Sequence, residues 1–119
     1  MPEPALEVLK GTLDVLVLKA LSWGAMHGYA VSRWIREVTG EALTIEEGAL
    51  YPTLHRLERR GLLEAEWDLT DNNRQAKFYR LTAAGRRELR AETITWGRFA
   101  EAVGHVLTAK QRPVWARSS

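Results

Sequence analysis

The sequence predicts a mainly α-helical protein with one small β-hairpin, folded as a winged helix-turn-helix and followed by a long C-terminal helix. Three observations carry this prediction. Apolar residues recur at helical spacing in three successive segments before residue 61. Gly61 then supplies a stop, and two short segments with strand-like alternation follow at once. A further helical pattern occupies residues 83–107.

Length and composition are those of a single globular domain. The chain has 119 residues, of which 45% are hydrophobic, enough for a modest core. It contains no cysteine, which excludes disulfide bonds and thiolate metal sites. No apolar run reaches the roughly 18 residues of a membrane span, and no signal pattern opens the chain. We therefore expect a cytoplasmic protein with no membrane partner.

The first two helices are predicted from apolar spacing and end signals. We expect the first over about Ala5 to Ser22, either tolerating Gly11 or starting at Thr12 as its N-cap. The second opens at His27-Gly28 and closes at Gly40. Its buried side is predicted to carry Val31, Trp34, Ile35 and Val38.

The third helix is the most informative segment. Thr44 and Glu47 predict a capping box, but Pro52 lies beyond the first turn, so the regular helix either starts nearer Gly48 or is kinked. Its apolar face consists of Leu50, Leu54 and Leu57. The opposite face carries Gly48, Pro52, His55 and Arg59, with Tyr51 and Arg56 on its flanks. A basic, aromatic face without carboxylates is suited to DNA phosphates and base edges.

The hairpin is predicted from alternation on either side of a polar loop. Its strands are expected over Leu62 to Trp67 and Ala76 to Leu81, and Asp71-Asn72-Asn73 suits a turn with positive φ. Arg74 and Lys77 in this wing would meet the DNA backbone beside the groove.

Catalytic, cofactor and metal sites find no support in the sequence. Glu64 and Glu66 share a strand face and would suit an acid/base or metal pair, but such residues more often solubilise and protect a hairpin edge. The three histidines, His27, His55 and His105, lie in different elements without ligand spacing. We expect no enzyme, no cofactor and no metal ion.

The final helix, from about Ala83 to Leu107 with Thr82 as its cap, is expected to form a dimer. Its apolar seam consists of Leu89, Thr93, Trp96, Ala100, Val103 and Leu107. A small domain cannot cover so long a seam, so a helix of a second subunit is the expected partner. Trp96 either packs in this interface or props the helices apart and leaves a flat apolar slot. Residues 108–119 are expected to be a flexible tail after a DNA-binding domain at 1–82 and a dimerisation helix at 83–107.

Four motifs in order and spacing resemble those of the PadR-like transcriptional regulators, over roughly residues 6–107. They are Gly11-Thr12-Leu13, Met26-His27-Gly28-Tyr29, Gly48-Ala49-Leu50-Tyr51-Pro52-Thr53-Leu54-His55-Arg56-Leu57-Glu58 and Lys77-Phe78-Tyr79-Arg80-Leu81-Thr82-Ala83-Ala84-Gly85. Many relatives carry a basic run in the wing, which Gln75 and Ala76 dilute here.

The resemblance implies a homodimeric repressor of the short type, with a single C-terminal dimerisation helix. Its recognition helices would enter successive major grooves of a pseudo-palindromic operator. The expected DNA-binding residues are Gly48, Tyr51, His55, Arg56, Arg59, Arg74 and Lys77. Some such regulators stack planar aromatic compounds on a tryptophan of this helix, which makes Trp96 the expected effector-binding residue.

Two other function classes remain open at this point. One is a constitutive DNA-binding protein without an effector, because the same recognition helix would serve both. The other is an interaction module that uses its winged helix to bind protein. Salt-dependent binding to DNA separates the interaction module from the two DNA-binding classes.

Overall fold

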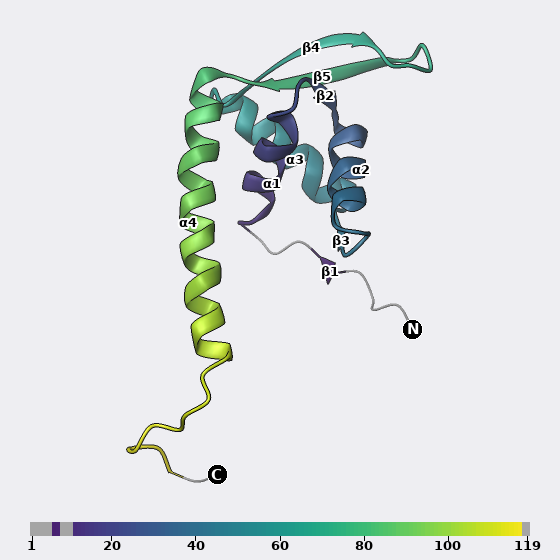
Figure 1. The fold of residues 1–119 in the computed structure, drawn as a ribbon. Coiled ribbons are helices and arrows are strands. Elements are labelled where there is room, and N and C mark those ends of the chain that lie inside the picture. Colours follow the sequence, from purple (N-terminus) through teal and green to yellow (C-terminus); the bar gives the residue numbers. More distant parts are fainter. Residues whose placement is uncertain (1–5, 8–10, 118–119) are drawn as a thin grey trace.

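A three-helix body, a β-hairpin and one long helix make up the molecule (Figure 1). The computed structural model describes residues 6–7 and 11–117. The elements of the body are α1 (Leu13–Leu21), α2 (Gly28–Val38) and α3 (Glu47–Arg59); the hairpin strands are β4 (Leu63–Leu69) and β5 (Gln75–Leu81), and α4 (Ala83–Leu107) follows them. This arrangement confirms the predicted fold class, mainly α with a small β-hairpin.

A short third strand ties the hairpin to the body. In β2 (Met26–His27), Met26 lies opposite Tyr79 and His27 opposite Phe78, so the sheet order is β2-β5-β4. The sequence analysis expected two strands, because a two-residue strand is too short to show alternation. A separate parallel pair joins β1 (Leu6–Glu7) to β3 (Leu43–Thr44).

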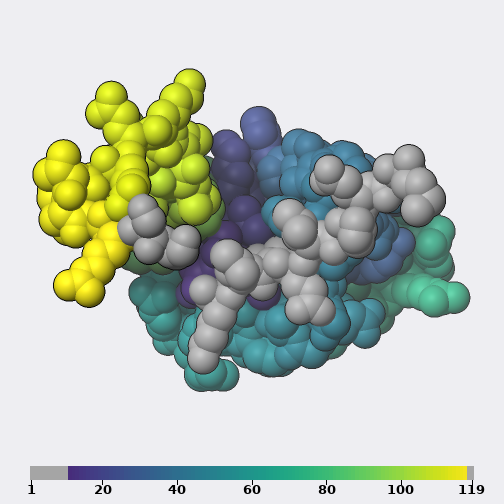
Figure 2. Space-filling view, turned by 90° about the horizontal axis from the view of Figure 1, so that it is seen from below, coloured from purple at the N-terminus to yellow at the C-terminus, as the bar shows by residue number. Residues whose placement is uncertain are grey.

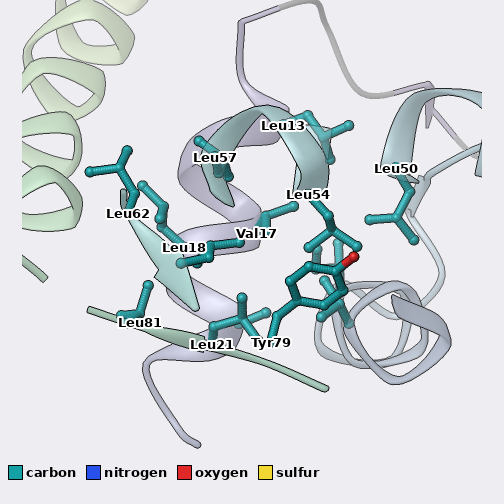
Figure 3. Close-up of a cluster of buried hydrophobic side chains, with 14 residues drawn as sticks. Leu13, Val17, Leu18, Leu21, Leu50, Leu54, Leu57, Leu62, Tyr79 and Leu81 are labelled. Carbon is teal, nitrogen blue, oxygen red and sulfur yellow. The ribbon is translucent and has the colours of Figure 1, made fainter. Parts of the chain in front are cut away.

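The core lies where α1, α2 and α3 meet the inner face of the sheet. Figure 3 shows side chains from α1, α3 and the strands gathered around Leu54 and Tyr79, both almost fully buried. The predicted apolar face of α3 is confirmed, since Leu50, Leu54 and Leu57 are all buried. The other fully buried large side chains are Val17, Leu18, Leu21, Val31 and Ile35. The prediction for Val38 is wrong, because this last residue of α2 is exposed.

The first helix is shorter than predicted. Residues 6–7 form a strand, Gly11 adopts a φ of 90°, and α1 begins at Leu13 with Thr12 at the N-cap position. A left-handed residue cannot continue a right-handed helix, so the apolar spacing upstream of Gly11 does not belong to α1. The other residues of the predicted extension, 5 and 8–10, lie outside the described residues.

The start of α3 also differs from the prediction. Thr44 pairs in β3, and Glu46 is the N-cap, so the predicted capping box does not form. Both Ala49 N and Leu50 N donate to the Glu46 carbonyl, each at 3.0 Å. Pro52 lies inside the helix. Proline has no N–H, so the helical hydrogen bond to the carbonyl group of Gly48 is missing.

Three predicted local signals are confirmed: the stop of α3 at Gly61, the positive φ in the hairpin loop and the cap of α4 at Thr82. Gly61, at a φ of 76°, lets Leu62 N donate to Leu57 O and its own N–H donate to Glu58 O, each at 3.0 Å, which is a Schellman stop. Asn73 supplies the positive φ of the hairpin loop. Thr82 Oγ1 accepts a hydrogen bond from Gly85 N at 3.0 Å and caps α4.

The start of α4 is anchored to the end of α3. Thr82 N donates to Leu62 O at 3.1 Å, and Thr82 Oγ1 donates to Gly61 O at 2.7 Å. Beyond this joint α4 runs past the body and stands at one side of it (Figures 1 and 2). The radius of gyration is accordingly 18.1 Å, against about 13.5 Å for a compact domain of this length.

We expect Gly85→Ala to destabilise the protein by roughly 1–3 kcal/mol, because the joint leaves no room for a side chain. A Cβ at residue 85 would overlap the Leu62 carbonyl oxygen and lie 3.2 Å from Leu81 Cδ2. Gly48→Ala is the matched control, since a Cβ there meets nothing within 4 Å. Chemical denaturation would measure both. Equal stability of the two variants would contradict the close packing at the joint.

Candidate nucleic-acid interface

A groove of about 840 Å³ lies between α3, the start of α2 and the hairpin. Its aromatic and basic side chains come from α2 and the residue before it, from α3 and from the hairpin, and are His27, Tyr29, Arg33, Tyr51, His55, Trp67, Arg74, Lys77 and Tyr79. One carboxylate, Asp71 in the hairpin loop, also lines it. Figure 1 shows the hairpin crossing above α2 and α3, with its tip extending beyond α2. Of the predicted DNA-binding residues, the groove brings together Tyr51, His55, Arg74 and Lys77.

Tyr51 is placed by its contact with the first residue of α2. A Cβ on Gly28 would lie 2.7 Å from Tyr51 Cε1 and 3.1 Å from the hydroxyl oxygen, so only a glycine leaves room for this ring. His27 caps the same helix end, where its Nδ1 accepts from Ala30 N at 3.3 Å. The positive end of the α2 dipole therefore lies beside the tyrosine, an environment that favours an anion.

The outward face of α3 is open to solvent. Gly48, His55 and Arg59 are all exposed, but only His55 also lines the groove. Within residues 11–117, Arg59 forms no ion pair with a carboxylate. This face thus offers a free guanidinium and an imidazole on the helix that the sequence analysis assigned to DNA.

Arg56 lies on the other flank of α3, away from the groove. Its Nη2 pairs with Asp14 Oδ1 of α1, and Arg60 contacts Asp14 at 3.9 Å and Glu88 of α4 at 3.8 Å. The Arg56 side chain is 45% exposed, so this ion pair contributes no more than about 1 kcal/mol. Arg56 would reach a phosphate only by leaving Asp14.

The two predicted wing residues differ in their surroundings. Lys77 Nζ contacts Glu58 Oε1 at 3.0 Å and lies 5.3 Å from the centre of the Tyr79 ring. The hydrogen bond to Glu58 raises the pKa of the Lys77 ammonium. Arg74 lies at the hairpin tip, where no ion pair holds it among the residues described. Arg74 is therefore the freer of the two cations.

Three residues that line the groove were not identified from the sequence as site residues. Tyr29 and Arg33 lie on the first turns of α2, and Arg33 Nε pairs with Glu37 at 2.7 Å. Trp67, on the inner face of β4, is 67% exposed. The alternation of β4 placed Trp67 on the same face as the buried Leu63. It did not reveal that this face is open to solvent at Trp67.

A second groove, of about 530 Å³, lies between α1 and α4. Trp96 lines it and is 42% exposed, with its ring centre 5.8 Å from that of Phe99 at an interplanar angle of 30°. Glu92 also lines it, and its Oε2 is buried without a hydrogen-bond partner among the described residues. Burial, and then the nearby Glu88 and Asp14 carboxylates, raise the pKa of Glu92.

The apolar seam of α4 is mostly uncovered. Leu89 packs partly buried against the core, whereas Trp96, Ala100, Val103 and Leu107 are exposed. Phe99 and Val106, which the seam did not include, widen the exposed apolar surface, and Ile94 is exposed as well.

Residues 6–7 and 11–117 hold no group of three or more acidic or histidine side chains arranged to bind a metal ion. Within them, no helix has the length and apolar character needed to cross a membrane.

Comparison with known proteins identifies the family. Residues 17–91 match the transcriptional regulator PadR-like family. A transcriptional regulator of Mycobacterium tuberculosis is 44% identical over 84 residues, 70% of this chain and 74% of that protein. The negative transcriptional regulator PadR of Bacillus subtilis is 26% identical over 77 residues, 65% of this chain and 42% of that protein.

A solved structure supports the same assignment. The PadR family transcriptional regulator of Eggerthella lenta superposes with a TM-score of 0.69 at 36% identity, covering 85% of this chain and 86% of that one. These relatives are regulators of transcription and not enzymes, as the sequence analysis expected. The chain belongs to the PadR-like family of DNA-binding transcriptional regulators.

Proposed function

We propose that the protein is a homodimeric repressor that binds a pseudo-palindromic operator through α3 and the wing. The observation that carries this proposal is the groove between α3, α2 and the hairpin, where Tyr51 and His55 of α3 lie with Arg74 and Lys77 of the hairpin beside an exposed helix face. The family supplies the regulatory role, and the Bacillus subtilis relative is a negative regulator by name.

The outward face of α3 would enter the major groove of the operator. Gly48 allows close approach of the backbone, His55 and Arg59 reach base edges or phosphates, and the Tyr51 hydroxyl donates to a phosphate. Arg74 and Lys77 contact the backbone from the wing, and Arg56 exchanges Asp14 for a phosphate. Residues 1–82 thus act as the DNA-binding unit, and residues 83–107 as the dimerisation helix.

We expect Arg59→Ala and Arg56→Ala to weaken binding to an operator obtained by binding-site selection, by about 1–3 kcal/mol where a base edge is contacted. Arg74→Ala should mainly lower the slope of log K against log salt, by about 0.9, because one phosphate contact is lost. Arg87→Ala, on α4 and outside the groove, is the matched control. Fluorescence anisotropy over a range of salt would measure both quantities.

Two results would count against this assignment. Unchanged affinity and salt slope in all three variants would mean that another face binds DNA. Failure of the selection to enrich any duplex, or binding that salt does not weaken, would favour the protein-interaction module.

The dimer is proposed from the uncovered apolar surface of α4. Trp96, Val103 and Leu107 lie on one side of a helix about 37 Å long, and all three are exposed. The corresponding surface of a second subunit would bury it, because a two-fold axis brings identical patches together. That axis would also set the distance between the two recognition helices.

We expect the parent to have the mass of two chains at micromolar concentration, measured by light scattering. The double variant Val103→Glu, Leu107→Glu should have the mass of one chain, because it places four charges in the shared seam at a cost of several kcal/mol. The control double variant Arg87→Glu, Arg98→Glu changes the other side of α4 and should remain a dimer. A parent with the mass of one chain would exclude this dimer.

We also propose that a planar aromatic effector binds at Trp96 and relieves repression. The groove between α1 and α4 supports this, because it joins Trp96 and Phe99 to a partly enclosed apolar space next to the proposed dimer surface. Binding would release DNA only if the effector prefers the spacing of recognition helices that does not fit the operator.

A panel of planar dyes and phenolic acids would test the effector site by calorimetry. Compounds that bind the parent should bind Trp96→Ala more weakly and Trp96→Phe to an intermediate degree, because stacking contributes roughly 0.5–1.5 kcal/mol per pair. Trp115→Ala, in the exposed segment after α4, is the control. Equal binding to the parent and Trp96→Ala would place the site elsewhere. If no compound binds and DNA release is never seen, the protein is a constitutive DNA-binding protein.

A further inference from the structure

We infer that Trp67 is a DNA-contacting residue, which packs its indole on the deoxyribose of the strand whose phosphates lie in the groove between α3 and the hairpin. This inference rests on the proposed DNA-binding function and extends it to an apolar contact. It begins from the exposure of Trp67, which is unusual for an indole on the inner face of a sheet.

The side chains on the inner face of the hairpin are buried near the body and exposed toward the tip. Near the body, Leu63 lies opposite Leu81 and both are buried; next, Ala65 lies opposite the buried Tyr79. Two residues further, Trp67 lies opposite Lys77 and is 67% exposed. The inner face of the hairpin therefore leaves the packed core at Trp67, whose indole faces the open groove opposite α2 and α3.

The outer face of the same strand has the opposite chemistry. Glu64, Glu66 and Asp68 alternate with the inner residues, and among the described residues only Glu64 of the three forms an ion pair, with Arg80 at 3.3 Å. A polyanion is repelled from this face. The hairpin is thus asymmetric, and DNA would approach it from the side that Trp67 occupies.

The surroundings of Trp67 match one strand of a duplex. Tyr51, His55 and Arg74 line the same groove and offer donors to phosphates. Between successive phosphates a DNA strand presents its sugar, whose C–H edges are the apolar part of the backbone. An indole among phosphate donors is placed to pack on that sugar.

An apolar contact has a signature that a basic contact lacks. Removing a cation from a phosphate lowers the salt slope, because fewer counterions are released on binding. Removing an indole from a sugar lowers the affinity and leaves the slope unchanged. The two roles are therefore separable by measurement on the same duplex.

The experiment compares the parent, Trp67→Ala and Trp67→Phe on a fluorescein-labelled duplex recovered by binding-site selection. Trp67→Ala should weaken binding about 2- to 12-fold with the slope of the parent, and Trp67→Phe should retain most of the affinity. Trp23→Ala is the matched control, since Trp23 has nearly the same exposure (65%) but lies in the turn after α1, outside the groove.

A second readout guards against a variant that fails to fold. DNA should change the intrinsic fluorescence of Trp67→Phe less than that of the parent, whereas Trp23→Phe should respond like the parent. Unchanged affinity of Trp67→Ala, a lowered salt slope, or an unaltered fluorescence response of Trp67→Phe would each overturn the inference. If the parent binds DNA and one of these contrary results is obtained, the inference about Trp67 is wrong and the proposed DNA-binding function stands. If the parent binds no duplex, both the inference and the proposed function are wrong.

Discussion

Two hydrogen bonds from Thr82 hold the start of α4 against the end of α3 and so fix where the hairpin and α4 leave the three-helix body. Gly61 and Leu62 follow the end of α3, and their carbonyl groups accept hydrogen bonds from Thr82, the N-cap of α4. Gly85 then packs against Leu62 without a side chain. The hairpin leaves and returns at this one place, so α3, the hairpin and α4 share one hydrogen-bonded connection. In the proposed dimer, a rotation of α4 would therefore move α3 and the hairpin with it.

Charge around α3 is divided between two sides. On one flank, Asp14 of α1 and Glu88 of α4 engage Arg56 and Arg60, which links three helices by surface ion pairs. On the other side, no carboxylate pairs with Arg59 within the described residues, and the groove faces the proposed DNA. Each ion pair is weak by itself, but together they orient the basic side chains before any ligand binds. The groove that holds Trp96 lies beside this network, since Glu88 belongs to both.

Some of the site could be assigned from the sequence and some could not, for a physical reason. Helical spacing identifies which residues share a face of α3, so His55 and Arg59 were placed correctly on the exposed side. Spacing says nothing of neighbours from other elements. It did not reveal that Asp14 forms an ion pair with Arg56, or that Glu58 forms one with Lys77. Nor did it reveal that α2 contributes Tyr29 and Arg33 to the groove.

Local structure could be predicted from the sequence, because it depends on residues close together in the chain. The leucine face of α3, the stop at Gly61, the turn at Asn73 and the cap at Thr82 all follow from side chains within a few positions. Local signals left two starts open for α1, and the left-handed backbone of Gly11 selects the later one. The contacts between elements were needed to show that β2 joins the sheet and that Trp67 faces an open groove and not the core. Both depend on segments distant in sequence, which leave no periodic pattern in the chain.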